Sequence, residues 1–66
     1  VYNEGDVLYP KIAGVKIMGG AAEAGKAIAT LDKGEELIYM GVEENGFLKV
    51  ESGKGGGWVK KILVAK

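Results

Sequence analysis

The stretch that decides the fold is GFLKV at residues 46–50, followed after a polar, glycine-rich connection by GWV at residues 57–59. In the first run Leu48 and Val50 alternate with Phe47 and Lys49, and a period of two is typical of a β-strand. Two such runs in succession predict an antiparallel hairpin. The connection at residues 51–56 is longer than a tight turn, so we expect a loop there rather than a two-residue turn.

This hairpin has an expected register. We expect Leu48 and Val59 to face the core opposite each other. In that register Trp58 lies across from Lys49, and Phe47 becomes its diagonal neighbour on the outer face. The stretch therefore predicts a small β module with aromatic residues on its outer surface.

The rest of the chain shows further short strand patterns, each ended by glycine, proline or a polar turn. Pro10 should stop the first strand, Ile28 should anchor the third, and Asn45-Gly46 is a strong signal for a tight turn. Tyr39 shares one face of its strand with Leu37, and we expect it in the core. The expected single strands lie at residues 7–9, 15–18, 27–31 and 36–42, and the hairpin lies at residues 47–60. Residues 62–64 should form a strand or a single helical turn.

Two segments need separate treatment. Residues 36–42 are apolar on both faces, so we expect a central or wrapped strand. Residues 21–26 are rich in alanine, but Gly25 weakens a helix and few large apolar residues could pack one. We expect a loop there with at most one helical turn. Together these elements predict an all-β fold, a small barrel of five to six short antiparallel strands.

Length and composition limit the possible functions. The chain has 66 residues, which allows one domain over residues 1–66, with residues 1–12 as a lead-in. Nine lysines balance nine acidic residues and there is no arginine, which argues against a nucleic-acid module. Histidine and cysteine are absent, so zinc sites of the usual kinds and thiol or imidazole chemistry are excluded. No apolar run is long enough for membrane insertion as a helix.

Three patterns are typical of catalysis or cofactor binding, but each lacks a feature that the chemistry requires. Residues 20–27 nearly form a phosphate-binding loop, but Ala27 stands where a magnesium-binding hydroxyl is required. The acid pairs at residues 35–36 and 43–44 lie at expected turns, where solvated carboxylates are the ordinary case. Ser52 is not part of a recognisable serine–base pair and stands alone in an expected loop. We therefore expect no enzyme, no cofactor and no metal.

The order of these motifs resembles the bacterial SH3-like domains. Residues 15–18 and 28–31 stand at the first two strands of that pattern, and Lys33-Gly34 follows. Residues 37–41, the Asn45-Gly46 hairpin and the GWV run at residues 57–59 complete the order. The similarity covers about residues 13–63 and implies an SH3-like barrel. Domains of this family often accompany cell-wall hydrolases and envelope proteins, where they help to hold the protein to peptidoglycan or a peptide.

The sequence departs from the family pattern where relatives line a ligand groove. Lys16 and Met18 stand where the family has Asn and Arg, and Phe47 replaces the usual first tryptophan of the hairpin. We hypothesise that Met18, Phe47 and Trp58 form an apolar groove for a peptide, with core packing of both rings as the open alternative.

The expected function is a non-catalytic binding module. The resemblance implies an accessory domain of a bacterial envelope protein, outside the cytoplasm, that recognises peptidoglycan or a peptide. The alternative is a structural or assembly domain that makes intramolecular or homo-oligomeric contacts through its sheet edges and binds no small ligand.

Overall fold

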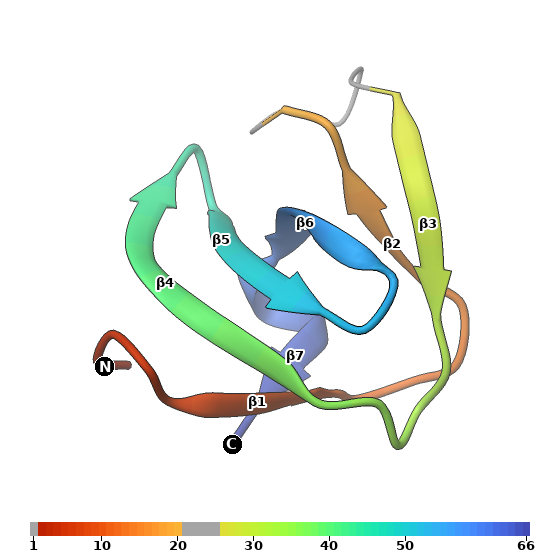
Figure 1. Ribbon diagram of the computed structural model, residues 1–66, viewed down its shortest axis with the longest axis horizontal. Coiled ribbons are helices and arrows are strands. Elements are labelled where there is room, and N and C mark those ends of the chain that lie inside the picture. Colours follow the sequence, from red (N-terminus) through yellow and green to blue (C-terminus); the bar gives the residue numbers. More distant parts are fainter. Residues whose placement is uncertain (1, 21–25) are drawn as a thin grey trace.

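A computed structural model describes residues 2–20 and 26–66 as one curled antiparallel sheet that forms a half-barrel (Figure 1). Its strand order is β3-β2-β6-β5-β4-β1-β7. The described strands are β1 (Val7–Pro10), β2 (Val15–Met18), β3 (Ala27–Leu31), β4 (Leu37–Glu44), β5 (Phe47–Ser52), β6 (Gly55–Lys60) and β7 (Val64–Ala65).

The all-β prediction is confirmed, with seven strands in place of five to six. The added strand, β7, has two residues and follows the single 3-10 turn η1 (Lys61–Leu63), so the chain end contains both of the expected alternatives. The expected loop at residues 21–26 falls almost entirely outside the described residues. Within those residues no helix has the length or apolar character to cross a membrane.

The β5–β6 hairpin has the expected register. Leu48 pairs with Val59, and Lys49 pairs with Trp58. The predicted loop at residues 51–56 is wrong, because the ladder continues to Ser52 and Gly55 and leaves a two-residue turn. The Ser52 hydroxyl closes this turn: it donates to the Gly55 carbonyl at 2.9 Å and accepts from the Lys54 amide at 3.1 Å. Glycine composition suggested a loop, but the cross-strand hydrogen bonds hold these glycines in a strand.

The β4–β5 hairpin turns at Asn45-Gly46, as the sequence predicted. Both residues have positive φ, 52° for Asn45 and 79° for Gly46. A two-residue hairpin turn of type I′ needs this backbone conformation at both positions, which is why Asn-Gly is favoured there.

Strand β4 lies between β5 and β1, so the expectation of a central strand is confirmed. Its inner face is buried through Leu37 and Tyr39, as predicted for Tyr39. Its outer face is not wrapped, since Ile38 is 38% exposed and Val42 39% exposed. Gly41, at φ +86°, lies where the β4–β5 register shifts, and a bulge of this kind bends the strand around the core.

The core lies on the concave side of the sheet and follows the period of two. Its buried members are Leu8, Val15, Ile17, Leu31, Leu37, Tyr39, Leu48, Val50, Val59 and Val64. Ile28 does not anchor β3, because it is 54% exposed. The anchor is Leu31, which is fully buried and pairs with Val15. We expected Pro10 to stop the first strand after residue 9. In the structure Pro10 is itself the last residue of β1 and pairs with Val64.

The amino-terminal segment is packed more closely than a polar lead-in. Tyr2 packs against the core, and its ring meets Tyr39 edge-on with centroids 6.3 Å apart. The Gly5 amide donates to the Tyr39 carbonyl at 2.8 Å. Residues 2–6 therefore cover one end of the sheet beside β4.

The β2–β3 hairpin joins the rest of the sheet through a short contact, which we call the β2–β6 seam. Its pairing among the described residues is Met18 with Trp58. Gly57 permits the close approach: a Cβ there would collide with the Ile17 side chain and lie 2.7 Å from the Met18 carbonyl oxygen.

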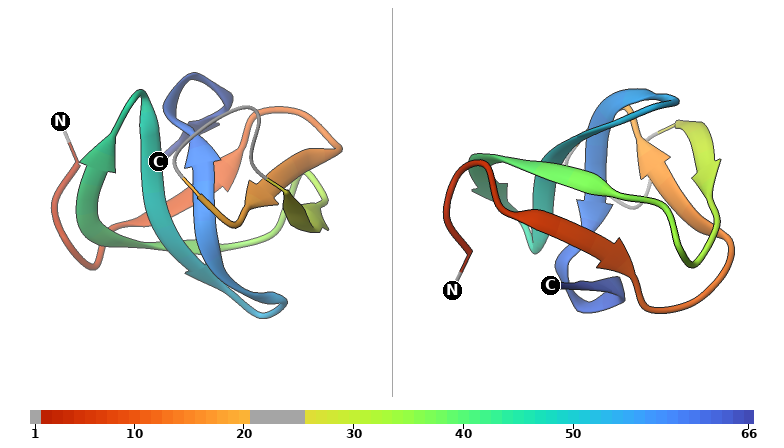
Figure 2. Two further views of the ribbon diagram at one scale, coloured as in Figure 1. Left: turned by 90° about the horizontal axis from the view of Figure 1, so that it is seen from above. Right: turned by 60° about the horizontal axis from the view of Figure 1, so that its bottom comes forward.

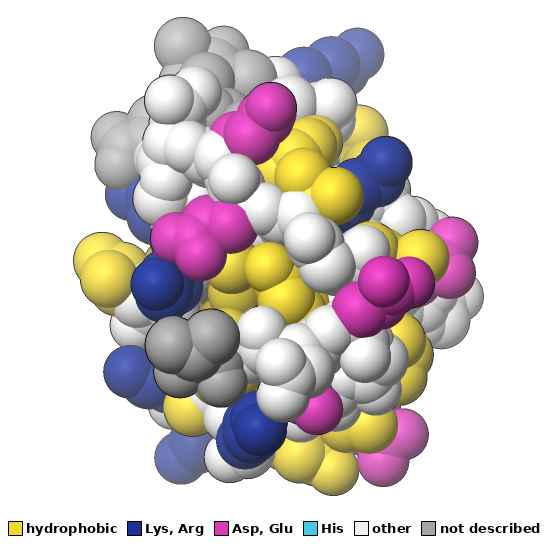
Figure 3. Space-filling view, turned by 90° about the vertical axis from the view of Figure 1, so that its left-hand side faces the viewer, with side chains coloured by type: hydrophobic (Ala, Val, Ile, Leu, Met, Phe, Trp, Pro, Cys, Tyr) yellow, Lys and Arg dark blue, Asp and Glu magenta, His cyan; other side chains and the backbone are white. Residues whose placement is uncertain are grey.

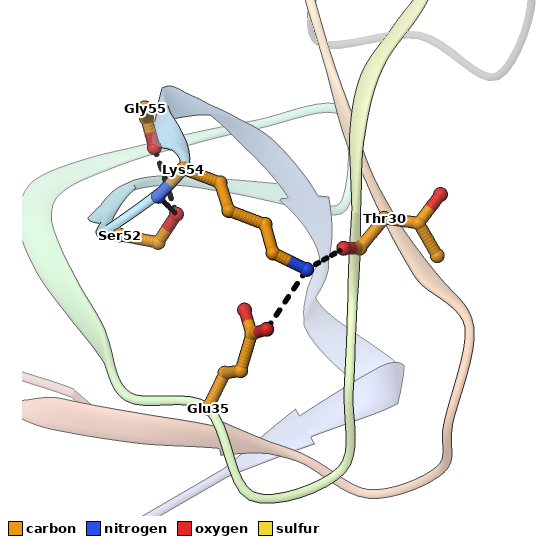
Figure 4. Close-up of polar contacts among 5 residues, drawn as sticks. All are labelled: Thr30, Glu35, Ser52, Lys54 and Gly55. Atoms are coloured by element: carbon orange, nitrogen blue, oxygen red, sulfur yellow. Dashed lines mark hydrogen bonds and ion pairs between the residues drawn. The ribbon is translucent and has the colours of Figure 1, made fainter.

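Lys54, at the tip of the β5–β6 hairpin, makes a second link to the β2–β3 hairpin (Figure 4). Its Nζ donates to the Thr30 carbonyl of β3 at 2.8 Å and pairs with Glu35 Oε1 at 2.9 Å. We call these two contacts the Lys54 clasp. The clasp connects three segments that are distant in the sequence: the hairpin tip, β3 and the turn that precedes β4.

Candidate functional site

An open groove of about 320 Å³ lies on the outer face of the sheet, beside the β2–β6 seam. Its lining comes from the loop before β2, from the outer side chains of β2, from the facing ends of β5 and β6, and from η1. The lining residues are Ile12, Gly14, Val15, Lys16, Met18, Phe47, Lys60 and Leu63. Of the three predicted site residues, Met18 and Phe47 line this groove.

The walls of the groove come from segments far apart in the chain. In Figure 2 the loop before β2 (orange) and the η1 segment (dark blue) lie on the same side of the molecule in both views. The Lys11 amide donates to the Leu63 carbonyl at 2.8 Å, which fixes the loop against η1. Ile12 and Leu63 are thereby brought to the same groove as the outer face of β2.

Phe47 forms part of the groove lining but is only 4% exposed. It does not belong to the main core, because strand alternation turns it away from the buried Leu48. The sequence left open whether Phe47 lines a surface groove or is packed in the interior, and each alternative holds in part. The ring is packed, and it is packed on the outer face, where it offers little surface of its own.

Met18 and Trp58 form the backbone pair that joins β2 to β6, and both side chains are half-buried. Met18 lines the groove, whereas Trp58 lies next to it without lining it. The register makes Phe47 and Trp58 diagonal neighbours, yet the ring contact found in the described residues is between Tyr2 and Tyr39. The three predicted residues therefore share one face without forming an aromatic cluster.

Two lysines that the sequence reasoning did not assign to the site also line the groove. Lys16 is exposed on β2, and Lys60 is half-buried at the end of β6 opposite Phe47. Lys60 takes part in an interaction within the chain, whereas no described acidic side chain forms an ion pair with Lys16. Lys16 and Met18 share one face of β2, so strand alternation could have identified Lys16. No local signal could have identified Ile12 or Leu63.

Three carboxylates in the described residues form ion pairs with exposed lysines. Glu43 pairs with Lys61 at 3.2 Å, and Glu35 pairs with Lys54. The hydrogen bond from the Lys54 ammonium to Glu35 raises the pKa of Lys54 above its ordinary value. No cluster of metal-ligating side chains is found within residues 2–20 and 26–66.

Asp6 joins the two ends of the described chain. The backbone amide of Asn3 donates to Asp6 Oδ2 at 2.7 Å, and Lys66 Nζ lies 3.0 Å from the same oxygen. The Asn3 hydrogen bond, followed by the contact with Lys66, lowers the pKa of Asp6. These contacts stabilise the edge of the sheet at β1 and β7, away from the groove.

The surface at the other end of β5, away from Phe47, has a different charge. A second depression is lined by Glu36, Ile38, Glu51, Ser52 and Gly53, and it contains two carboxylates and no lysine. Figure 3 shows the neighbouring face over β4 and the amino-terminal segment, where acidic side chains lie among hydrophobic ones. The zero net charge thus hides two depressions of opposite charge.

No protein-family model matches this chain, and neither a curated protein sequence nor a solved structure matches it significantly.

Proposed function

We propose that this domain is a non-catalytic binding module that holds an extended peptide segment in the groove beside the β2–β6 seam. The observation that carries the proposal is the groove itself. It is open, it measures about 320 Å³, and half-buried Met18 and packed Phe47 give it an apolar base. A concave, mostly apolar surface with a few polar groups is the usual form of a binding site for small ligands and peptides.

The residue types suit a peptide better than a catalytic substrate. Methionine adapts its shape to varied apolar partners, and Phe47 is held rigidly by its surroundings. Trp58 remains partly accessible beside Met18, where it can extend the contact surface. Among the described residues of the lining, the titratable side chains are those of Lys16 and Lys60.

The resemblance to bacterial SH3-like domains supports a setting outside the cytoplasm, in an envelope protein. There the peptide would belong to peptidoglycan or to another protein of the envelope. Both sources present the same chemistry, an extended peptide chain.

Nuclear magnetic resonance titration of the ¹⁵N-labelled chain with a soluble peptidoglycan digest tests this proposal. We expect shifts at Met18, Phe47 and Trp58 and at their neighbours in the groove. Met18→Ser should weaken the response by removing apolar surface, whereas Met40→Ser, which changes a half-buried methionine of β4 outside the groove, should not. Equal responses in both variants, or shifts spread over the second depression, would reject the groove as the site.

The assembly alternative predicts a different result. A domain that serves in assembly would show a concentration-dependent dimer by sedimentation and no shifts in the groove on addition of the digest. The edge strand β3 and its exposed Ile28 are the features that such a contact would use.

A further inference from the structure

We infer that the ligand of the groove is an acidic peptide segment, with a carboxylate held by Lys16 and a neighbouring apolar side chain seated on Met18 and Phe47. This inference rests on the proposed binding function and adds the charge of the ligand to it. It comes from how charged residues are divided over the surface of a chain whose total charge is zero.

The groove contains two cations and no described anion. Lys16 and Lys60 are the charged members of its lining. A depression lined by charges of one sign concentrates the electric field and attracts the opposite charge. Four of the chain's described glutamates are placed elsewhere: Glu36 and Glu51 in the second depression, Glu35 in the clasp and Glu43 against Lys61.

Lys16 is the side chain best placed to bind a carboxylate. It is exposed, it projects from the outer face of β2, and no described acidic group neutralises it. Lys60 already has an interaction within the chain, so we assign it only a contribution to the positive potential. The carboxylate would therefore lie toward β2, which β6 separates from Phe47 on β5.

The apolar part of the ligand follows from the position of Met18. Met18 and Lys16 are two residues apart on the same face of β2, and side chains so spaced lie about 7 Å apart. In an extended peptide, residues i and i+2 share one face at the same spacing. Two such residues of a bound peptide can therefore lie over Lys16 and Met18. One apolar side chain on Met18 and Phe47 then places an acidic residue near Lys16.

The test compares four peptides by calorimetric titration of the whole chain at low salt. Three are blocked at both ends and differ only in the residues two positions from leucine on either side, which share its face in an extended chain: Ac-Glu-Gly-Leu-Gly-Glu-NH2, its glutamine version and its lysine version. The fourth, Ac-Gly-Gln-Leu with a free carboxyl terminus, separates a main-chain carboxylate from an acidic side chain. We expect the glutamate peptide to bind at least about fivefold more tightly than the glutamine peptide, a preference that decreases in 0.5 M salt.

Two variants with the same change in charge control the assignment. Lys16→Glu should reverse the preference, so that the lysine peptide binds more tightly than the glutamate peptide. Lys33→Glu alters an exposed residue of the turn before β4, outside the groove, and should keep the original preference. The spectrum of each free variant shows whether its fold is unchanged.

The outcomes separate this inference from the proposed function. Equal binding of the glutamate and glutamine peptides, with shifts in the groove, would overturn the acidic ligand and leave a peptide-binding groove. A preference for glutamate that persists in Lys16→Glu would overturn the role of Lys16. If none of the four peptides binds, the inference is wrong, and the titration with the peptidoglycan digest decides the proposed function independently.

Discussion

Strand β6 has two neighbours, and it is joined to them in different ways. With β5 it forms a continuous ladder from Phe47 and Lys60 to Ser52 and Gly55. With β2 its described pairing is Met18 with Trp58. The ladder is held by backbone hydrogen bonds along its whole length, while the β2–β6 seam relies on close packing of Ile17 over Gly57 and on the Lys54 clasp.

This difference shows where the sheet can be altered without unfolding all of it. Backbone hydrogen bonds do not depend on side-chain identity, so exposed side chains of the ladder can be changed at little cost in stability. A seam held by packing depends on the shape of a few residues. The groove lies beside that seam, so the residues that set the strength of the seam also set the shape of the candidate site.

Removing the Ile17 side chain should have the largest effect on stability. Ile17 is fully buried at the seam, and Ile17→Ala should lower the free energy of unfolding by about 2–5 kcal/mol. Urea denaturation followed by circular dichroism measures this loss. Ile62→Ala, at a side chain that is 74% exposed, should change stability by less than about 0.5 kcal/mol. Equal losses in the two variants would show that packing at Ile17 does not support the seam.

The second-largest loss of stability is expected when one methyl group is added at Gly57. The new Cβ would press on Ile17 and on the Met18 carbonyl, so Gly57→Ala should cost about 1–3 kcal/mol and force β2 away from β6. Hydrogen exchange should become faster in β2 and β3 than in β5. Gly53→Ala is the matched control, because nothing lies within 4 Å of its Cβ position. If Gly57→Ala matches this control, the close approach is not what holds the seam.

Cutting the Lys54 clasp should have a smaller effect that depends on pH. Lys54→Met removes both contacts of the ammonium group and should lower Tm slightly at neutral pH. The folded pKa of Lys54 lies above its ordinary value of 10.5, so the clasp stabilises the fold below that pH and its contribution is lost as pH rises through the folded pKa.

Thermal melts from pH 8 to 11.5 measure the difference in Tm between wild type and Lys54→Met. We expect the difference to shrink at the alkaline end of this range. Lys33→Met, an exposed lysine for which no ion pair is found in the described residues, should show no such trend. A constant difference across the range would mean that the charge of Lys54 plays no part.

The smallest effect is expected far from the seam, at Asp6. Its lowered pKa means that its contacts with Asn3 and Lys66 stabilise the fold above the ordinary value of 3.8 and are lost as pH falls through the folded pKa. Asp6→Asn should therefore melt slightly below wild type at pH 6 and with little difference near pH 2. The groove should be unaffected, so a changed peptide affinity in this variant would contradict the separation of the two regions.

The sequence predicted the ladder well and the seam poorly. Alternation in residues 46–50 and 57–59 fixed the register of β5 and β6, and Asn45-Gly46 fixed the turn before them. These are local signals, readable within a few residues. The two-residue turn at Gly53-Lys54 was missed, because a glycine-rich composition is the same in a loop and in a paired strand.

The candidate site was predictable only in part, for the same reason. Alternation predicted Phe47 and Trp58 on the outer face, Met18 was predicted beside them at the edge of the loop after its strand, and the structure puts Met18 and Phe47 in the groove lining. Ile12 and Leu63 complete the groove through a contact between residues 11 and 63, which no local pattern encodes. The burial of Phe47 depends on such contacts between distant segments and could not be predicted from its strand.

Trp58 gives the domain a natural optical reporter. It is the only tryptophan in the chain, and it sits on the pair that joins β6 to Met18 of β2. Its emission wavelength responds to water reaching the indole, so a red shift should accompany separation of β2 from β6 even while β5 stays paired. Opening of this one junction can therefore be followed by fluorescence in the unlabelled protein, on a timescale that stopped-flow mixing can resolve.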